Sequence, residues 1–191
     1  MSTPLRDESP GFHHVMCRGN NKRRIVVDDR DRDYFCIWVT KVARENHWRI
    51  LAWCLMDNHY HLLIEVTDMG LSAGMCELNS GYARNFNRCH GRVNHLFGSR
   101  YRSRRVKTHA EMLNVVRYIV QNPVRARIPG TLEGNVWCSY AATLGLAHSK
   151  IELAREAGLS FFGSAPNRAV EQFRIFCSTL PLAATPRWQP P

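Results

Sequence analysis

The sequence predicts an α+β protein with a ferredoxin-like antiparallel sheet, helices on one face of that sheet, and the other face open to a ligand. The first observation is the order of the periodic segments: strand, helix, strand, strand, helix, strand, the split β-α-β arrangement. The second is size, because 191 residues with 45% hydrophobic side chains suffice for one core and are too few for two large domains. We expect a main domain over residues 1–140 and a helical extension with a proline-rich tail over residues 141–191.

The first half of the chain alternates between strand and helix patterns. Short apolar runs predict strands, whereas apolar residues spaced three and four apart predict a helix. The predicted elements are a strand at 11–18, a helix from Asp31 or Asp33 to about Asn46, and strands at 49–56 and 59–67. Only Asp57 and Asn58 separate the last two strands, which predicts a tight antiparallel hairpin.

The second half begins with an amphipathic helix pattern and ends in weaker signals. The predicted elements are a helix at 71–89, a strand from about Leu96 to Lys107, a helix at 109–122, and two short helices at 149–158 and 169–179. For the helix at 109–122, Thr108 is the expected N-cap and Glu111 completes a capping-box spacing. Pro123 is expected to end that helix. We expect the proline-rich stretch 181–191 to be mobile.

The stretch His59-Tyr60-His61 carries the strongest functional signal. On a strand, His59 and His61 point to the same side because side chains alternate, and the two imidazoles can then chelate a metal ion. The same alternation sends Tyr60 to the core side, so the histidine pair faces a surface that a substrate can reach. Two ordinary surface or hydrogen-bonded histidines would give the same pattern, so the pair alone does not decide the matter.

The charge of the chain fits a polyanionic partner. Lys and Arg total 26 against 16 Asp and Glu, which gives a net charge of +10. No acidic residue lies between Leu78 and Ala110, a stretch in which a solvated charge run would usually mix both signs. If this stretch is a strand, Arg100, Arg102 and Arg104 line one face as a stripe, an arrangement suited to a phosphate backbone.

A tyrosine and an amide share one side of the predicted helix at 109–122. Tyr118 and Asn122 are four residues apart and therefore stack on the same helix face. Tyr118 offers a nucleophilic oxygen, and Asn122 offers an oxygen ligand. A half-buried tyrosine that only packs the helix against the core would leave the same pattern.

Five motifs occur in the order and at the spacing of a known family, within residues 11–140. They are Arg18-Gly19-Asn20-Asn21-Lys22, Met56-Asp57-Asn58-His59-Tyr60-His61-Leu62-Leu63, Arg100-Tyr101-Arg102-Ser103, Tyr118-Ile119-Val120-Gln121-Asn122-Pro123-Val124-Arg125-Ala126 and Trp137-Cys138-Ser139-Tyr140. In these motifs the chain resembles the REP-associated tyrosine transposases, a branch of the single-tyrosine HUH transposases.

The resemblance assigns roles to individual residues. It implies that His59 and His61 are the metal-binding pair, that Tyr118 is the catalytic tyrosine, and that Asn122 completes the metal site. With the basic and amide-rich stretches, it gives candidate DNA contacts at Arg18, Asn20, Asn21, Arg84, Arg88, Arg100, Arg102, Arg104, Lys107 and Arg125. One departure is visible, because Asp57 stands where family members commonly have proline. We expect it to alter turn rigidity at most, or to add negative charge near the metal.

The resemblance also implies an activity. A divalent ion, Mg or Mn, would assist cleavage of single-stranded or hairpin DNA through a 5′-phosphotyrosine link to Tyr118. By ligand softness, two imidazoles also suit Zn, Ni or Co, and we expect Mn to bind better than Mg. The DNA would be a repetitive palindromic element folded as a hairpin, and whether the protein acts as a monomer or a homodimer stays open.

Two other classes of function remain open from the sequence. One is a non-catalytic module that binds single-stranded nucleic acid on the sheet, and the other is a metal-dependent hydrolase of a small phosphoester. The first has no need for His59, His61 and Tyr118, and the second has no need for the arginine-rich stretch. Covalent attachment to DNA separates both from the transposase prediction.

The cysteines and the termini suggest a compartment. Seven cysteines are scattered without any Cys-x-x-Cys pair, which is typical of thiols in a reducing cytoplasm. We expect neither a signal peptide nor a membrane span, because the start of the chain is polar and no apolar run approaches 18 residues. The expected location is therefore cytoplasmic, in association with the nucleoid.

Overall fold

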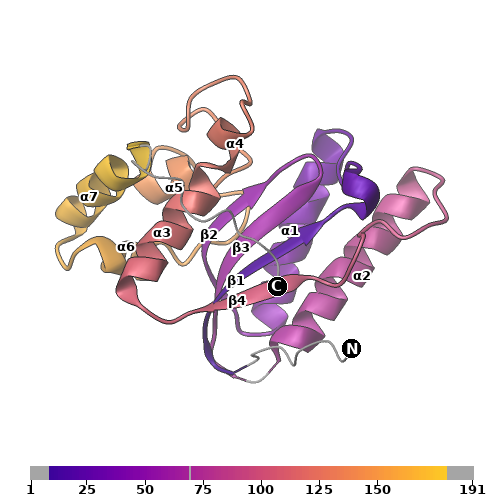
Figure 1. Cartoon of the computed structure of the whole chain (residues 1–191), viewed down its shortest axis with the longest axis horizontal. Coiled ribbons are helices and arrows are strands. Elements are labelled where there is room, and N and C mark those ends of the chain that lie inside the picture. The colour runs from indigo at the N-terminus through magenta and orange to yellow at the C-terminus, as the bar shows by residue number, and fades with distance from the viewer. Residues whose placement is uncertain (1–8, 69, 180–191) are drawn as a thin grey trace.

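A four-stranded antiparallel sheet organises the protein, which we describe from a computed structural model over residues 9–68 and 70–179. The strand order is β2-β3-β1-β4 (Figure 1). The strands are β1 (Gly11–Arg18), β2 (Arg49–Leu55), β3 (His59–Val66) and β4 (Arg102–Val106). Helix α1 (Asp29–Glu45) follows β1 and helix α2 (Leu71–Cys89) follows β3. This connectivity confirms the predicted ferredoxin-like α+β fold.

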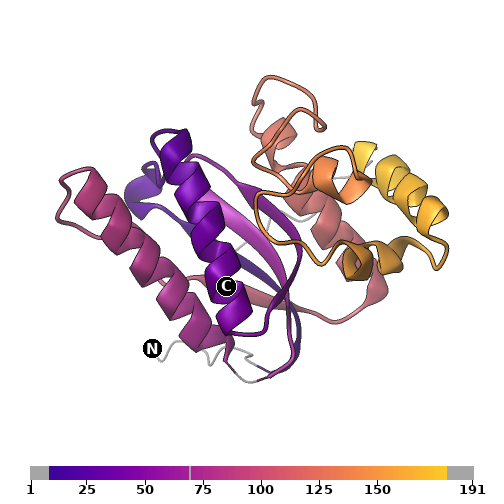
Figure 2. The ribbon, with the colours of Figure 1, turned by 180° about the vertical axis from the view of Figure 1, so that it is seen from behind.

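Helices α1 and α2 cover one face of the sheet and bury the larger core (Figure 2). Alternation in β1 and β3 sends every second side chain to this face, Tyr60, Leu62 and Ile64 among them. Phe35 of α1 packs on Tyr60, with ring centroids 5.0 Å apart. The prediction for Tyr60 is confirmed, and the side chains on either side of it in β3 must therefore face away from α1 and α2.

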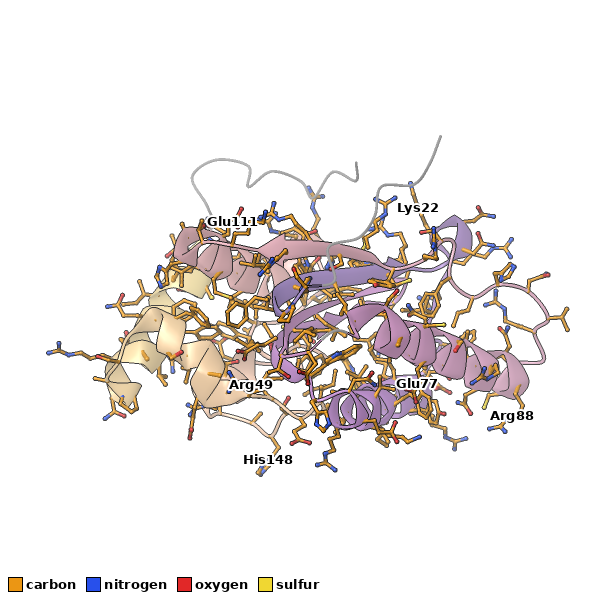
Figure 3. All side chains as sticks on the ribbon, turned by 90° about the horizontal axis from the view of Figure 1, so that it is seen from below. Lys22, Arg49, Glu77, Arg88, Glu111 and His148 are labelled. Carbon is orange, nitrogen blue, oxygen red and sulfur yellow. The ribbon has the colours of Figure 1, made fainter. Side chains whose placement is uncertain are left out.

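The other face of the sheet is only partly open, which corrects the sequence prediction. Helix α3 (His109–Val120) packs on β2 and β3 there, and Leu51 and Leu63 are buried with it in a second core. Figure 3 shows Glu111 of α3 and Glu77 of α2 on opposite sides of the sheet. The physical reason is that β2 is apolar on both faces, so neither face of this strand can be left to solvent.

The C-terminal part of the second core adds helices that pack on α3, on β2 and on one another. They are α5 (Tyr140–Leu144), α6 (Arg155–Leu159), the 3-10 turn η2 (Ser160–Phe162) and α7 (Pro166–Ser178). The helix predicted at 169–179 is confirmed apart from its start. The one predicted at 149–158 is wrong, because the chain turns helical only at Arg155, and α5 was not predicted. The predicted tail at 181–191 lies outside the described residues.

Residues 137–139 close the edge of the sheet at β2. The amide of Leu55 donates to the Trp137 carbonyl at 2.9 Å, and the amide of Ser139 donates to the Trp53 carbonyl at 3.0 Å. The Ser139 hydroxyl also accepts from the Trp53 amide at 3.0 Å, and the backbones of Cys138 and Cys54 form an isolated antiparallel β-bridge. The motif at 137–140 therefore supplies backbone partners to a strand that would otherwise have a free edge.

Several predicted boundaries shift for identifiable reasons. Helix α1 starts before Asp31, because Asp28 is the N-cap and accepts from the Asp31 amide at 3.0 Å. The regular pairing with β1 covers Arg102–Val106 of the predicted 96–107 strand, and the Gly98 amide adds one hydrogen bond to the Arg18 carbonyl at 3.0 Å. Helix α3 ends at Val120, and Pro123 lies in the first turn of the short helix α4 (Asn122–Arg125). The Thr108 cap is confirmed, since its hydroxyl accepts from the Glu111 amide at 3.2 Å.

The helices and the cysteines can be compared with what the sequence led us to expect about a membrane span and about thiols. Within the described ranges, no helix has both the length and the apolar character that a bilayer crossing requires. All seven cysteines are free thiols, and five of them are buried.

Candidate functional site

The β2–β3 hairpin fixes the two histidines of the His59-Tyr60-His61 motif. The amide of Met56 donates to the His59 carbonyl at 2.8 Å and closes the tight turn, as predicted. On the neighbouring strand β1, Arg18 pairs with His59 and Met16 pairs with His61. Both imidazoles thus lie on the face that α3 partly covers. His61 is only 1% exposed, whereas His59 is half-buried and borders solvent.

Tyr118, near the end of α3, and Asn122, the first residue of α4, lie beside the histidine pair. The rings of Tyr118 and His61 meet edge to face, with centroids 5.3 Å apart. The Asn122 amide nitrogen donates to the Tyr118 carbonyl at 2.8 Å, and the Asn122 side chain also forms a hydrogen bond with His59. The four residues that the sequence singled out from two distant segments therefore meet in one place.

One buried ring nitrogen in this group lacks a partner. Within the described part of the chain, the Nε2 atom of His61 is buried and forms no hydrogen bond. The Nδ1 atom of His59 is 2.6 Å from the Asn58 side-chain oxygen, which leaves Nε2 for the hydrogen bond with Asn122, and a metal ion at Nε2 would take the place of that hydrogen bond. A buried nitrogen without a partner is costly unless a ligand takes its lone pair. Two imidazoles and an amide oxygen form a donor set that fits a divalent ion.

Asn122 is the candidate for the third donor of such a site. The described residues hold no group of three or more histidine, cysteine, aspartate or glutamate side chains suited to a metal ion. Two histidines alone bind a divalent metal ion weakly. The amide oxygen of Asn122 and oxygens from solvent or substrate would therefore have to complete the coordination shell of the ion.

Burial keeps the histidines of the site neutral. It lowers the pKa of His59 to about 4, and the positive charge of Arg18 acts in the same direction. Burial also holds the pKa of His61 well below its usual value, with His14 and His59 adding to the effect. A neutral imidazole is the form that binds a metal ion, so protons do not compete for these nitrogens near pH 7.

Burial and nearby positive charge have opposite effects on the pKa of the Tyr118 hydroxyl. Burial raises the pKa of Tyr118, while the guanidinium groups of Arg125 and Arg18 oppose that rise. The Arg125 guanidinium carbon lies 5.3 Å from the centroid of the Tyr118 ring. The phenol is therefore protonated near neutral pH, and two positive charges are close enough to stabilise negative charge that develops on its oxygen.

A basic cleft of about 640 Å³ opens beside Tyr118. Among the residues that line it are Arg18, Asn21, Lys22, Arg100, Arg102 and Tyr118. Arg102 pairs with Met16 of β1, and Met16 pairs on its other side with His61 of β3, while Arg100 precedes β4 and reaches the cleft from the loop. The cleft can hold an extended anionic chain with one of its phosphates next to Tyr118.

Three further candidates, Arg104, Lys107 and Asn20, do not line this cleft. Arg104 pairs with His14 across β1 and β4 and forms an ion pair with Glu111 at 3.4 Å. Lys107 follows β4 and is exposed. Asn20 lines a neighbouring cleft of about 680 Å³ between α2 and residues 95–101.

Arg84 and Arg88 are not brought to the site. Both are exposed on α2, whose apolar side packs against the opposite face of the sheet. Figure 3 shows Arg88 on the far side of the sheet from Lys22, which lines the cleft. Their spacing in the sequence predicted correctly that they share one side of a helix, but it carried no information about which sheet face the helix covers.

Asp57 points away from the histidines. Its carboxylate forms ion pairs with Arg32 and, at 3.5 Å, with Arg24, while its carbonyl accepts from the amides of Ile25 and Val26. The residue ties the histidine hairpin to the start of α1. This supports the expectation of an effect on the turn, and the carboxylate is already neutralised by two arginines.

Two residues at the site were missed from the sequence. His14 is buried beside His61, with its Nε2 atom 3.0 Å from His61 Nδ1, and Asn58 contacts His59. Alternation along β1 separates His14 from His13, but only the pairing of β1 with β3 brings His14 to His61. That pairing is set by the three-dimensional fold, so no local signal could have found this contact.

Comparison with known proteins adds an independent line of evidence. Residues 11–122 match a family described as "Transposase IS200 like". A solved structure of a REP-associated tyrosine transposase bound to a REP hairpin has a TM-score of 0.63 at 17% sequence identity, covering 81% of this chain and 96% of that chain. A candidate transposase from Deinococcus radiodurans has a TM-score of 0.44 at 16% identity, covering 68% of this chain and 100% of the other. None of the curated proteins gives a significant match.

Proposed function

The chain belongs to the IS200-like transposase family, and on that premise we propose that it cuts and rejoins single-stranded DNA with Tyr118 as the nucleophile. The observation that carries the proposal is the position of Tyr118. Its ring touches His61, whose Nε2 atom has no partner, and its side chain lines the basic cleft. A nucleophile, a site for a Lewis acid and a path for a phosphate chain meet at this point.

Hairpin DNA is the substrate that this proposal implies. The structural neighbour with the same fold is described as bound to a REP hairpin, and we propose a REP-like hairpin with a single-stranded flank for this protein as well. Arg18, Arg100 and Arg102 supply the positive charge that a phosphate backbone needs along the cleft. The same proposal associates the protein with the nucleoid.

The reaction follows from the positions of these side chains. The Tyr118 oxygen attacks the phosphorus of a phosphodiester, the bond from phosphorus to the 3′ oxygen breaks, and the 3′ end leaves as a hydroxyl. The phenolic proton is lost and the 3′ oxygen gains one, so the step is balanced. A bound divalent ion, Mg or Mn, held by His59, His61 and Asn122, would polarise the scissile phosphate and offset its charge. Arg125 and Arg18 would stabilise the developing charge on the tyrosine oxygen.

The link formed in this step makes rejoining possible. The 5′-phosphotyrosine ester conserves the energy of the broken phosphodiester. A 3′-hydroxyl can therefore attack it and restore a DNA strand without ATP. We propose that the protein acts as a strand transferase for this reason, and that release by water is a side reaction.

The C-terminal helices support the catalytic helix in this proposal. The Gln121 side-chain nitrogen donates to the Cys177 carbonyl at 2.7 Å, and His109 at the other end of α3 lies 2.7 Å from the Phe161 carbonyl. We propose that residues 1–140 are the catalytic unit and that the extension from residue 141 holds both ends of α3 in position.

A denaturing gel tests the proposal directly. A hairpin oligonucleotide labelled at its 3′ end is incubated with the protein and Mn²⁺, then boiled in detergent. We expect a labelled band at the mass of protein plus cleaved DNA. A non-catalytic binding module gives no covalent band, and a hydrolase of small phosphoesters releases products without one. Absence of the band over a panel of hairpins from the source genome would refute the proposed chemistry.

The arginines of the cleft are expected to set the salt dependence of DNA binding. Replacement of Arg100 or Arg102 by alanine should weaken binding to all hairpins alike. It should also make the slope of log affinity against log salt shallower by roughly 0.7 to 0.9 for each phosphate that the protein no longer neutralises. The measurement is a fluorescence-anisotropy titration at several salt concentrations.

The matched controls for the cleft arginines are Arg84→Ala and Arg88→Ala. They remove the same charge from the opposite face of the sheet and should leave the slope unchanged. Equal effects of both pairs of substitutions would mean that the DNA does not follow the cleft.

A further inference from the structure

His14 forms a buried contact with one of the two proposed metal ligands. Its Nε2 atom lies 3.0 Å from Nδ1 of His61, and the two side chains belong to the neighbouring strands β1 and β3. His14 is 2% exposed and His61 is 1% exposed, so water does not compete for this hydrogen bond. The ring centroids of His14 and His61 are 5.1 Å apart, and those of His14 and Tyr118 are 5.7 Å apart in an edge-to-face arrangement.

Only one proton can lie between these two nitrogens. If His61 Nδ1 carries it, His14 accepts, and the Nε2 atom of His61 has a free lone pair. If His14 Nε2 carries it, His61 Nδ1 accepts, and a neutral His61 must then hold its proton on Nε2. An Nε2 atom that carries a proton cannot bind a metal ion. The direction of this hydrogen bond therefore decides whether His61 can be a ligand.

The surroundings of His61 favour the first arrangement. Its Nε2 atom is buried and has no hydrogen-bond partner among the described residues. A proton on that atom would be a buried donor without an acceptor, whereas a lone pair there is what a metal ion would take. We propose that His14 is a positioning residue that holds His61 in the Nδ1–H tautomer and aims its Nε2 atom at the metal site. This proposal rests on the metal site of the proposed function.

A hydrogen bond also favours one tautomer of His59, with a different partner. The Asn58 side-chain nitrogen donates to the Lys22 carbonyl at 3.1 Å, which turns the Asn58 oxygen toward His59 Nδ1 at 2.6 Å. An amide oxygen can only accept, so His59 Nδ1 must carry the proton. The contact with Asn58 thus favours for His59 the tautomer that His14 favours for His61, and the hydrogen bond with Asn122 falls to the Nε2 atom of His59.

The test begins with the unmodified protein. Long-range ¹H–¹⁵N spectra of histidine rings distinguish the Nδ1–H and Nε2–H tautomers, and loss of one ring signal set in His61→Ala assigns His61. We expect the Nδ1–H pattern for His61 in the metal-free protein. The Nε2–H pattern would overturn the proposal without any variant of His14.

Two substitutions of His14 then distinguish its role as a hydrogen-bond acceptor from a role in packing. His14→Leu keeps much of the volume and removes the acceptor, and we expect it to mix the His61 tautomers and to weaken Mn²⁺ binding about 10- to 100-fold in a titration with the metal alone. His14→Gln keeps an oxygen that can accept from His61 Nδ1, and we expect it to restore affinity to within about threefold of the unmodified protein. Equal Mn²⁺ affinity in both variants would refute the role of the hydrogen bond.

A matched control comes from the same strand. His13 is also buried, but it faces the other side of the sheet, where Nε2 lies 2.8 Å from the Ser9 carbonyl. His13→Leu should leave Mn²⁺ affinity and the His61 tautomer unchanged, while all three variants should bind hairpin DNA in chelator. Mn²⁺ binding that depends on His14 without any covalent DNA band would uphold this proposal and refute the proposed function instead.

Discussion

Tyr118→Phe is expected to bind hairpin DNA with the affinity of the unmodified protein and to form no covalent adduct. The phenylalanine ring keeps the edge-to-face contact with His61, so α3 and the cleft keep their shape. Only the attacking oxygen is removed. We expect cleavage to fall by about 10⁴-fold or more, as removal of the nucleophile does in other enzymes that form covalent intermediates. Single-turnover cleavage of a labelled hairpin measures this decrease, and anisotropy measures binding.

Tyr60→Phe is the matched control for the nucleophile. Tyr60 lies between the two histidines in the sequence, but its hydroxyl donates to the Asn79 side chain at 2.7 Å on the other face of the sheet. Tyr82 is equally remote, since its hydroxyl donates to the Ile25 carbonyl at 2.7 Å inside the core. We expect Tyr60→Phe to cleave like the unmodified protein, and full cleavage by Tyr118→Phe would remove Tyr118 from its role.

His61→Ala is expected to abolish cleavage, and an excess of chelator should do the same to the unmodified protein. Without His61, one imidazole and one amide remain, a set too small to hold a divalent ion beside the scissile phosphate. His59→Ala should give the same result for the same reason. We expect cleavage to fall by about 10³-fold or more in each variant, comparable with other removals of charge stabilisation at a reacting centre.

The control for the metal is DNA binding in the presence of chelator. The arginines of the cleft do not depend on the ion, so the affinity for a hairpin should change little when the ion is removed. Cleavage that persists in chelator would show that the two histidines have a structural role only.

The sequence predicted the elements whose signal is local. β1 and α2 have the predicted bounds, because period-two alternation and spacings of three and four residues are properties of the segment itself. The start of α1 was predicted too late, since its first turn is polar and lacks an apolar spacing. The partial cover over the second sheet face was missed, although Leu51 and Leu63 required it.

For the candidate site, the sequence indicated the residues but not all of their neighbours. The geometry of His59 and His61 follows from alternation on one strand, and that of Tyr118 and Asn122 follows from one helix turn. The roles of these four residues came from a family resemblance. His14 could not be assigned, because its contact with His61 depends on which strands pair, and Arg84 and Arg88 could not be excluded, because helix spacing does not reveal which sheet face is covered.

The pairing of residues 137–139 with β2 can form only late in the synthesis of the chain. Ser139, the partner of Trp53, is synthesised 86 residues later, so β2, the first strand of the histidine hairpin, leaves the ribosome long before its edge partner exists. Until then its amides and carbonyls can pair with another nascent chain, and contacts this distant in sequence form slowly. A fragment that stops at Asn122 would contain His59, His61, Tyr118 and Asn122 and would still be prone to aggregate through β2.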